Sequence, residues 1–100
     1  MKHNKLIRSK ILEFLDQKNI PYTYHLADDA EYTQKLYEKL LEEAVEVAKD
    51  RNREELADLL EVVEAIKKHN GWSTSEIEEI RLKKLENKGS FEEPIILEES

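Results

Sequence analysis

The sequence predicts an all-α protein: a helical bundle of about four helices, with a minor two-stranded β element from residues near 22–26 and 91–97. Composition is the first reason, because Glu, Lys and Leu are abundant while there are only two Gly and two Pro. The second is that apolar residues recur at helical spacing along most of the chain. A length of 100 residues makes one domain at most, so we expect a single domain over residues 1–100.

The first predicted helix runs from Lys5 to Lys18, and Asn19-Ile20-Pro21 ends it. Residues 22–26 are aromatic and β-branched, which is typical of a short strand. Residues 91–97 include Ile95-Ile96-Leu97 after a proline and predict a second strand. We expect these two segments to pair, because an isolated strand has no partner for its backbone groups.

Capping residues predict the starts of three further helices. Asp28 and Ser73 each precede a Glu by three residues, which is the pattern of a capping box. Asn52 is a cap for the helix between them, and Asn70-Gly71 is a good C-terminal pair for that helix. The expected helices therefore run over about residues 29–49, 53–70 and 74–87.

Charge and composition exclude several classes of function. A net charge of -7 argues against a nucleic-acid binder, which needs a basic face. The absence of cysteine excludes disulfides and thiolate sites and fits a reducing compartment, so we expect the cytoplasm. No apolar run approaches the roughly 20 residues that a membrane span requires, so we expect no membrane partner.

Four carboxylates are spaced for one site. Residues three apart on a helix are separated by about 60° around its axis, so Glu43 and Glu46 share a face of the second helix. Glu55 and Asp58 share a face of the third helix for the same reason. A short turn joins the two helices, so we expect them to pack antiparallel and to bring all four carboxylates to one level.

Carboxylates held together repel one another, and a hard divalent cation removes that cost. Oxygen ligands without His or Cys argue against zinc and copper and favour Mg²⁺, with Mn²⁺ as the alternative. The competing interpretation is an ordinary solvated helix face, in which Glu55 completes a capping box with Asn52 and Glu43 pairs with Lys39. Spacing alone leaves both interpretations open.

The order Glu42-Glu43-x-x-Glu46 and then Glu55-x-x-Asp58 resembles the signature of the all-α NTP pyrophosphatases, the superfamily of MazG, the dimeric dUTPases and phosphoribosyl-ATP pyrophosphohydrolase. Residues 5–11 resemble the opening Lys-Leu-Val-Arg-Asp-Lys-Ile of a short subgroup similar to the last of these. Residues 40–43, 54–62 and 81–97 resemble further blocks of that subgroup in the same order. The chain departs from it at Ser9, Lys88 and Ser90, where Asp, Arg and Gly are usual.

The resemblance implies hydrolysis of a nucleoside triphosphate between the α and β phosphates, giving a nucleoside monophosphate and pyrophosphate. House-cleaning of non-standard nucleotides is an analogy with the family. The implied ligands of Mg²⁺ are Glu43, Glu46, Glu55 and Asp58. The implied catalytic carboxylates are Glu42, Glu43 and Glu46, with Glu42 outside the metal shell or acting as the base toward water.

An acidic protein that binds an anionic substrate needs local cations. The candidates for contact with substrate phosphates lie outside the acidic helices: Arg8, Lys10, Arg81, Lys84 and Lys88. Ordinary surface charge is the competing explanation for each of them. We also expect a homo-oligomer, with a dimer as the first choice, because a chain this short buries little alone and its helices carry wide apolar faces.

Three alternatives to this function stay open. A non-catalytic helical module would use its acidic face to bind a basic partner. A nucleotide sensor would keep the fold and the metal but would not turn over. Within the same class of enzyme, the alternative is a phosphoribosyl-ATP pyrophosphohydrolase.

Overall fold

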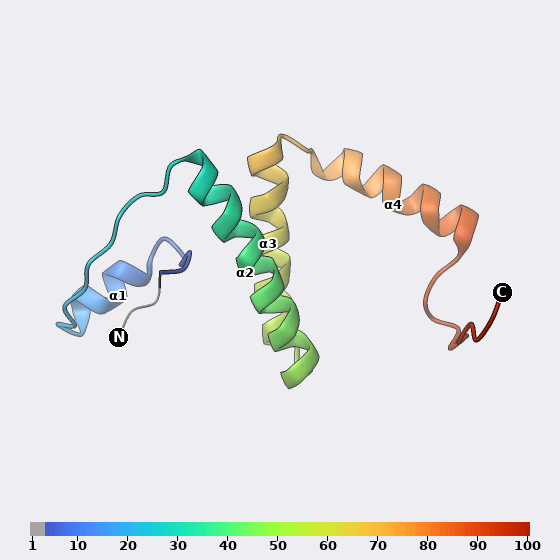
Figure 1. Ribbon diagram of the computed structural model, residues 1–100, viewed down its shortest axis with the longest axis horizontal. Helices are drawn as coiled ribbons and strands as arrows, with labels where there is room; N and C mark the ends of the chain where they lie inside the picture. The colour runs from blue at the N-terminus through green and yellow to red at the C-terminus, as the bar shows by residue number, and fades with distance from the viewer. Residues whose placement is uncertain (1–3) are drawn as a thin grey trace.

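A computed structural model of the chain describes residues 4–100, which form four helices and the segments that join them (Figure 1). The helices are α1 (Ile11–Gln17), α2 (Asp29–Asp50), α3 (Arg53–Asn70) and α4 (Thr74–Lys88). The all-α prediction with about four helices is therefore confirmed. None of the helices in the described range combines the length and the apolar character needed to cross a membrane.

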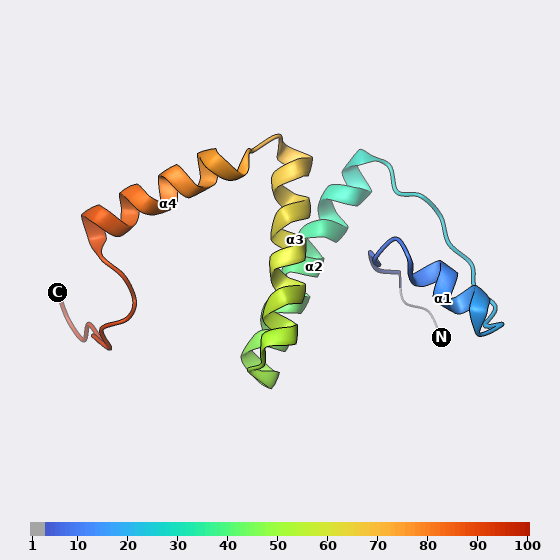
Figure 2. The same ribbon diagram turned by 180° about the vertical axis from the view of Figure 1, so that it is seen from behind.

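The predicted β element is wrong. Residues 22–26 lie in the linker between α1 and α2, residues 91–97 lie in the segment after α4, and neither forms a strand. The two segments lie toward opposite ends of the longest axis of the molecule in both ribbon views (Figures 1 and 2). Local β propensity favours an extended backbone but does not bring two segments together, so neither finds a partner.

The first helix is shorter than the predicted Lys5–Lys18. It begins at Ile11, and Lys10 before it provides no side-chain cap. The apolar periodicity at Leu6 has another cause, because Leu6 packs against the core formed by α2 and α3. The predicted stop is confirmed, since α1 ends at Gln17 and Asn19 has a positive φ of 56°.

The predicted caps form as expected. Asp28, Asn52 and Ser73 each accept a hydrogen bond from the backbone N–H three residues later, at 2.9, 2.9 and 3.1 Å. These bonds satisfy N–H groups that have no partner inside their own helix. Gly71 ends α3 with a φ of 70°, a conformation that glycine adopts without steric cost.

α2 and α3 form an antiparallel hairpin, and they are the only helices in residues 4–100 that pack extensively against each other. Arg51 and Asn52 connect them. Arg51 lies in the left-handed region at a φ of 52°, and its backbone N–H donates to the carbonyl oxygen of Val47 at 2.9 Å. The small core, Leu36, Val62 and Ile66, lies between the two helices.

α4 leaves the hairpin at the end of α3 that lies away from the turn, and it extends outward (Figure 1). The radius of gyration is 17.8 Å, whereas a compact domain of 100 residues has about 13 Å. Many large apolar side chains consequently remain exposed, among them Ile80 on α4 and Phe91 after it.

Leu36→Ala should destabilise the chain by about 2–5 kcal/mol, because it empties the centre of a core that has few other members. Chemical denaturation followed by circular dichroism measures the change in the free energy of unfolding. Leu26→Ala is the control: Leu26 is 89% exposed in the linker, so we expect a change within about 0.5 kcal/mol. Equal effects of the two substitutions would show that the core lies elsewhere.

Candidate metal centre

Carboxylates from α2 and α3 converge near the turn of the hairpin. The side chains of Glu43, Glu55 and Asp58 each offer an oxygen within 4.8 Å of the others. Glu46, Asp50 and Glu55 form a second group under the same limit. All four predicted ligands therefore lie in one region, arranged as two clusters that share Glu55.

The short turn produces this convergence. Glu46 lies five residues before Arg51 and Glu55 four residues after it, so the two side chains stand at similar heights on antiparallel helices. Glu43 and Asp58 lie eight residues before and seven after, one turn further along. Sequence reasoning did not include Asp50, although its spacing of four from Glu46 places it on the same helix face and could have indicated it.

Glu55 has the electrostatic signature of this crowding. Desolvation by its neighbours raises the pKa of Glu55, and repulsion from Asp50, Asp58, Glu46 and Glu43 raises it further. Each of these effects disfavours the ionised form of Glu55 in the absence of a cation. The donor set consists of carboxylate oxygens alone, which fits a hard divalent cation such as Mg²⁺ or Mn²⁺ and does not fit zinc or copper.

Basic side chains approach the acidic groups from the N-terminal segment. The guanidinium of Arg8 donates to Asp58 at 2.9 Å, and the ammonium of Lys5 donates to Glu42 at 3.1 Å. The hydrogen bond from Lys5 is the main reason why the pKa of Glu42 is lowered. The segment before α1 thus supplies positive charge to a region that the two long helices make negative.

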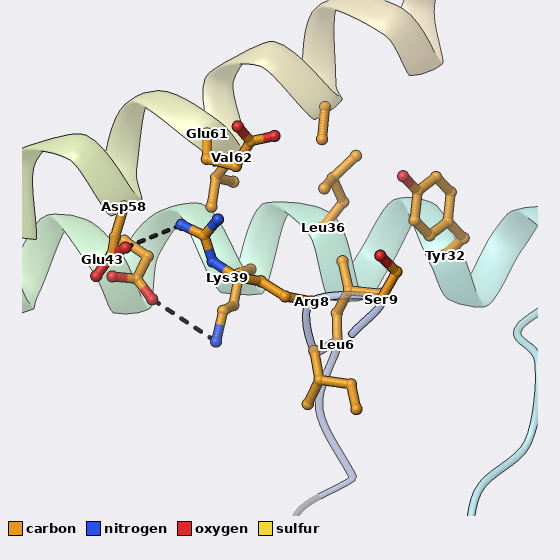
Figure 3. A pocket seen from close by; sticks show the side chains of 12 residues that line it. Leu6, Arg8, Ser9, Tyr32, Leu36, Lys39, Glu43, Asp58, Glu61 and Val62 are labelled. Carbon is orange, nitrogen blue, oxygen red and sulfur yellow. Dashed lines mark hydrogen bonds and ion pairs between the residues drawn. The ribbon is translucent and has the colours of Figure 1, made fainter. Parts of the chain in front are cut away.

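Lys39 is the third cation at the site. Its ammonium lies 3.5 Å from a carboxylate oxygen of Glu42 and 3.6 Å from one of Glu43. Figure 3 shows Lys39 and Arg8 reaching the same acidic region from α2 and from the N-terminal segment. Sequence reasoning did not count Lys39 among the phosphate contacts, although it lies four residues before Glu43 on the same face of α2.

A pocket of about 400 Å³ lies against the acidic groups. Glu43 and Asp58 line it near the turn, and Tyr32 lines it further from the turn on α2 (Figure 3). Between them its wall includes the apolar side chains of Leu36 and Val62. Carboxylates, cations and an apolar wall therefore meet in one cavity.

The predicted phosphate contacts are dispersed. Arg8 lines the pocket, whereas Lys10 directly precedes α1 and does not line it. The other three lie on α4, which extends away from the acidic clusters (Figures 1 and 2): Arg81, Lys84 and Lys88. Arg81 donates instead to Glu78 on its own helix, which lowers the pKa of Glu78. Within one chain these three side chains do not join the site.

Comparisons of the chain with protein-family models, with curated proteins and with solved structures found no match. The resemblance to the all-α NTP pyrophosphatases therefore stays a prediction from the sequence motifs.

Mg²⁺ should raise the melting temperature of the chain, and Glu55→Gln should remove that effect, because Glu55 belongs to both carboxylate clusters. Thermal unfolding with millimolar Mg²⁺ and with EDTA measures the difference. Glu38→Gln is the matched control, since Glu38 lies on the same hairpin but in neither cluster. If Mg²⁺ does not change the melting temperature of the unaltered chain, the result would favour an ordinary solvated acidic face.

Proposed function

We propose that the chain is a Mg²⁺-dependent nucleoside triphosphate pyrophosphohydrolase that works as a homo-oligomer. It cleaves the bond between the α and β phosphates and releases a nucleoside monophosphate and pyrophosphate. The observation that supports the proposal most directly is that Glu43 and Asp58 of the first carboxylate cluster line one pocket together with two cations and an apolar wall. A solvated acidic face accounts for the carboxylates but does not account for the pocket beside them.

Glu43, Glu55 and Asp58 would hold the cation, with Glu46 as the fourth ligand. The raised pKa of Glu55 supports this assignment: desolvation is its main cause, and the repulsion from neighbouring carboxylates that adds to it is relieved by a divalent cation. When bound, Mg²⁺ neutralises charge on phosphate oxygens and lowers the pKa of coordinated water.

Arg8 and Lys39 are the proposed phosphate contacts. Both line the pocket, and both are engaged with carboxylates that are candidate metal ligands, Asp58 and Glu43. If those carboxylates held a cation, Arg8 and Lys39 would lose these partners and would be free to bind phosphate oxygens. Arg8 suits this role because its guanidinium offers paired donors to a phosphate group.

The remainder of the nucleotide would occupy the pocket toward Tyr32. Tyr32 and Glu43 are eleven residues apart on α2, which corresponds to roughly 16 Å along the helix axis. The apolar wall formed by Leu36 and Val62 suits the face of a base or sugar better than it suits phosphate. The phosphates would therefore lie near the turn and the nucleoside near Tyr32.

Glu42 is the proposed base toward the attacking water, and Glu43 and Glu46 are the other catalytic candidates. The hydrogen bond from Lys5 lowers the pKa of Glu42, which favours the ionised side chain but makes it a weaker base for as long as Lys5 stays bound to it. Water would attack one phosphorus atom, its proton would pass to the carboxylate, and the bridging oxygen would leave with the other phosphate group.

The deciding experiment is pyrophosphate release from canonical and damaged nucleoside triphosphates, measured with Mg²⁺ and with EDTA. Release that requires Mg²⁺ would support the enzyme and would rank its substrates. Binding of nucleotide without release would favour a sensor, and no binding would favour an interaction module. If phosphoribosyl-ATP were the only substrate that released pyrophosphate, the chain would instead be a phosphoribosyl-ATP pyrophosphohydrolase.

Glu43→Gln should reduce Mg²⁺-dependent pyrophosphate release by at least about 100-fold, because it removes a ligand charge from the first cluster. Without metal, the variant should be at least as stable as the unaltered chain, because the substitution relieves repulsion. Glu38→Gln, on the same helix and outside both clusters, should leave release unchanged. Turnover of Glu43→Gln at the unaltered rate would remove Glu43 from the site.

Arg8→Ala should have two opposite effects. It should tighten Mg²⁺ binding without nucleotide by up to about fivefold, because it removes the competing partner of Asp58. It should raise KM for the triphosphate, because it also removes a phosphate contact. Calorimetry with Mg²⁺ alone and steady-state kinetics measure the two effects separately. An unchanged KM in the variant would show that Arg8 does not contact the phosphates and only pairs with Asp58.

A further inference from the structure

Lys67 is the one charged residue that is buried within residues 4–100, with 8% of its surface exposed. Its ammonium donates to the carboxylate of Glu64 at 2.7 Å and to the hydroxyl of Thr74, the first residue of α4, at 3.0 Å. An ammonium has three N–H donors, so these two bonds leave one for a further acceptor. Lys67 lies on α3 outside the pocket beside the carboxylates, and the proposed catalytic site does not use it.

Lys67 lines a second pocket, of about 340 Å³, at the junction of α2, α3 and α4. Its wall is largely apolar and includes Leu40, Val63, Ile66 and Ile77. Binding sites for small molecules have this size and this composition, with an apolar wall and a few polar groups that orient the ligand. The second pocket shares no residue with the pocket beside the carboxylates.

The polar side chains of the second pocket offer hydrogen-bond donors. Neither the ammonium of Lys67 nor the indole of Trp72 has an acceptor atom. The hydroxyl oxygen of Tyr37 already accepts a hydrogen bond from Asn70 at 3.2 Å, which leaves its O–H to donate. A ligand that complements this pocket therefore combines an apolar body with an oxygen acceptor.

The charge of Lys67 favours a carboxylate as that acceptor, because a hydrogen bond between two ionised groups is stronger than one between neutral groups. Glu64 shows that a carboxylate fits against this ammonium. The Glu64 side chain is 46% exposed, so it can turn into water when another carboxylate takes its place. Breaking an ion pair with a partner this exposed costs little.

We propose that the second pocket binds an amphipathic monocarboxylate. The carboxylate of the ligand replaces that of Glu64 on Lys67, and its apolar body lies against Trp72 and the aliphatic wall. Because Ile77 belongs to α4, the bound ligand connects α4 to the hairpin, against which α4 otherwise packs little. The proposal does not rest on the catalytic one, since the two pockets share no residue.

Octanoate is the first probe, and Trp72 is the reporter because it is the only tryptophan of the chain and lines the pocket. Without metal or nucleotide, we expect octanoate to change the fluorescence of Trp72 in a saturable way. Octan-1-ol and octylammonium keep the apolar body and lack the negative charge, so they should bind at least about tenfold more weakly. Equal binding of all three would overturn the proposal, because it would show an apolar surface that does not recognise a carboxylate.

Two substitutions should change the affinity for octanoate in opposite directions. Lys67→Met keeps the length of the side chain and removes the ammonium, so it should weaken binding at least about tenfold. Glu64→Gln removes the competing carboxylate, so it should tighten binding by up to about fivefold. Lys68→Met is the matched control, since Lys68 is exposed and does not line the pocket, and its affinity should be unchanged.

An affinity that Lys67→Met leaves unchanged would overturn the proposal, and so would a lack of binding by the folded unaltered chain. If Lys67→Met does not fold, Glu64→Gln and the comparison with octan-1-ol decide the case. A second probe, 4-phenylbutyrate, distinguishes the two kinds of apolar body. Tighter binding than octanoate would indicate an aromatic acid that stacks on Trp72, and weaker binding would indicate an aliphatic acid.

Discussion

Arg51 and Asn52, the two residues between α2 and α3, hold these helices at one relative height, and the rest of the molecule depends on that register. Arg51 turns the backbone with a positive φ, and Asn52 caps the helix that follows. The register brings Glu43 to Asp58 and Glu46 to Glu55, and it brings Leu36 to Val62 in the core. A backbone connection this short thus determines both the packing and the charge distribution.

The hairpin separates two kinds of surface. One side gathers carboxylates and draws the basic N-terminal segment to them through Lys5 and Arg8. The other side is apolar and carries no charge over Leu41, Val45 and Leu60. Because Leu41 and Val45 lie about 160° from Glu43 around the axis of α2, the carboxylates and these exposed apolar residues occupy different faces of that helix.

Local signals in the sequence were sufficient to predict α2, α3 and α4. The caps at Asp28, Asn52 and Ser73 act over three residues, so their positions could be predicted from neighbouring residues alone. The prediction of the β element was wrong because strand pairing depends on distant segments, and α4 places residues 91–97 far from residues 22–26. The predicted start of α1 was wrong because the apolar side chain of Leu6 packs against α2 and α3 and does not belong to the apolar stripe of a helix.

The carboxylates of the candidate site could be predicted from the sequence, because their positions depend on the helical period and on the length of the turn. That logic found Glu43, Glu46, Glu55 and Asp58 together, and it could also have found Asp50. It could not find which cations approach the carboxylates, because the position of the N-terminal segment and the direction of α4 depend on tertiary packing. Arg8 reaches the pocket, and the basic residues of α4 do not.

Glu55 is a member of both carboxylate clusters, and this shared membership couples them. When the carboxylate of Glu55 rotates toward one cluster, the positions of its oxygens relative to the other cluster change as well. A change in charge or binding at Glu43 and Asp58 that reorients Glu55 therefore also alters the surroundings of Glu46 and Asp50. By thermodynamic reciprocity the reverse influence has the same size. The two clusters consequently form one linked unit, in which a cation bound at one cluster would change the affinity of the other cluster for a cation.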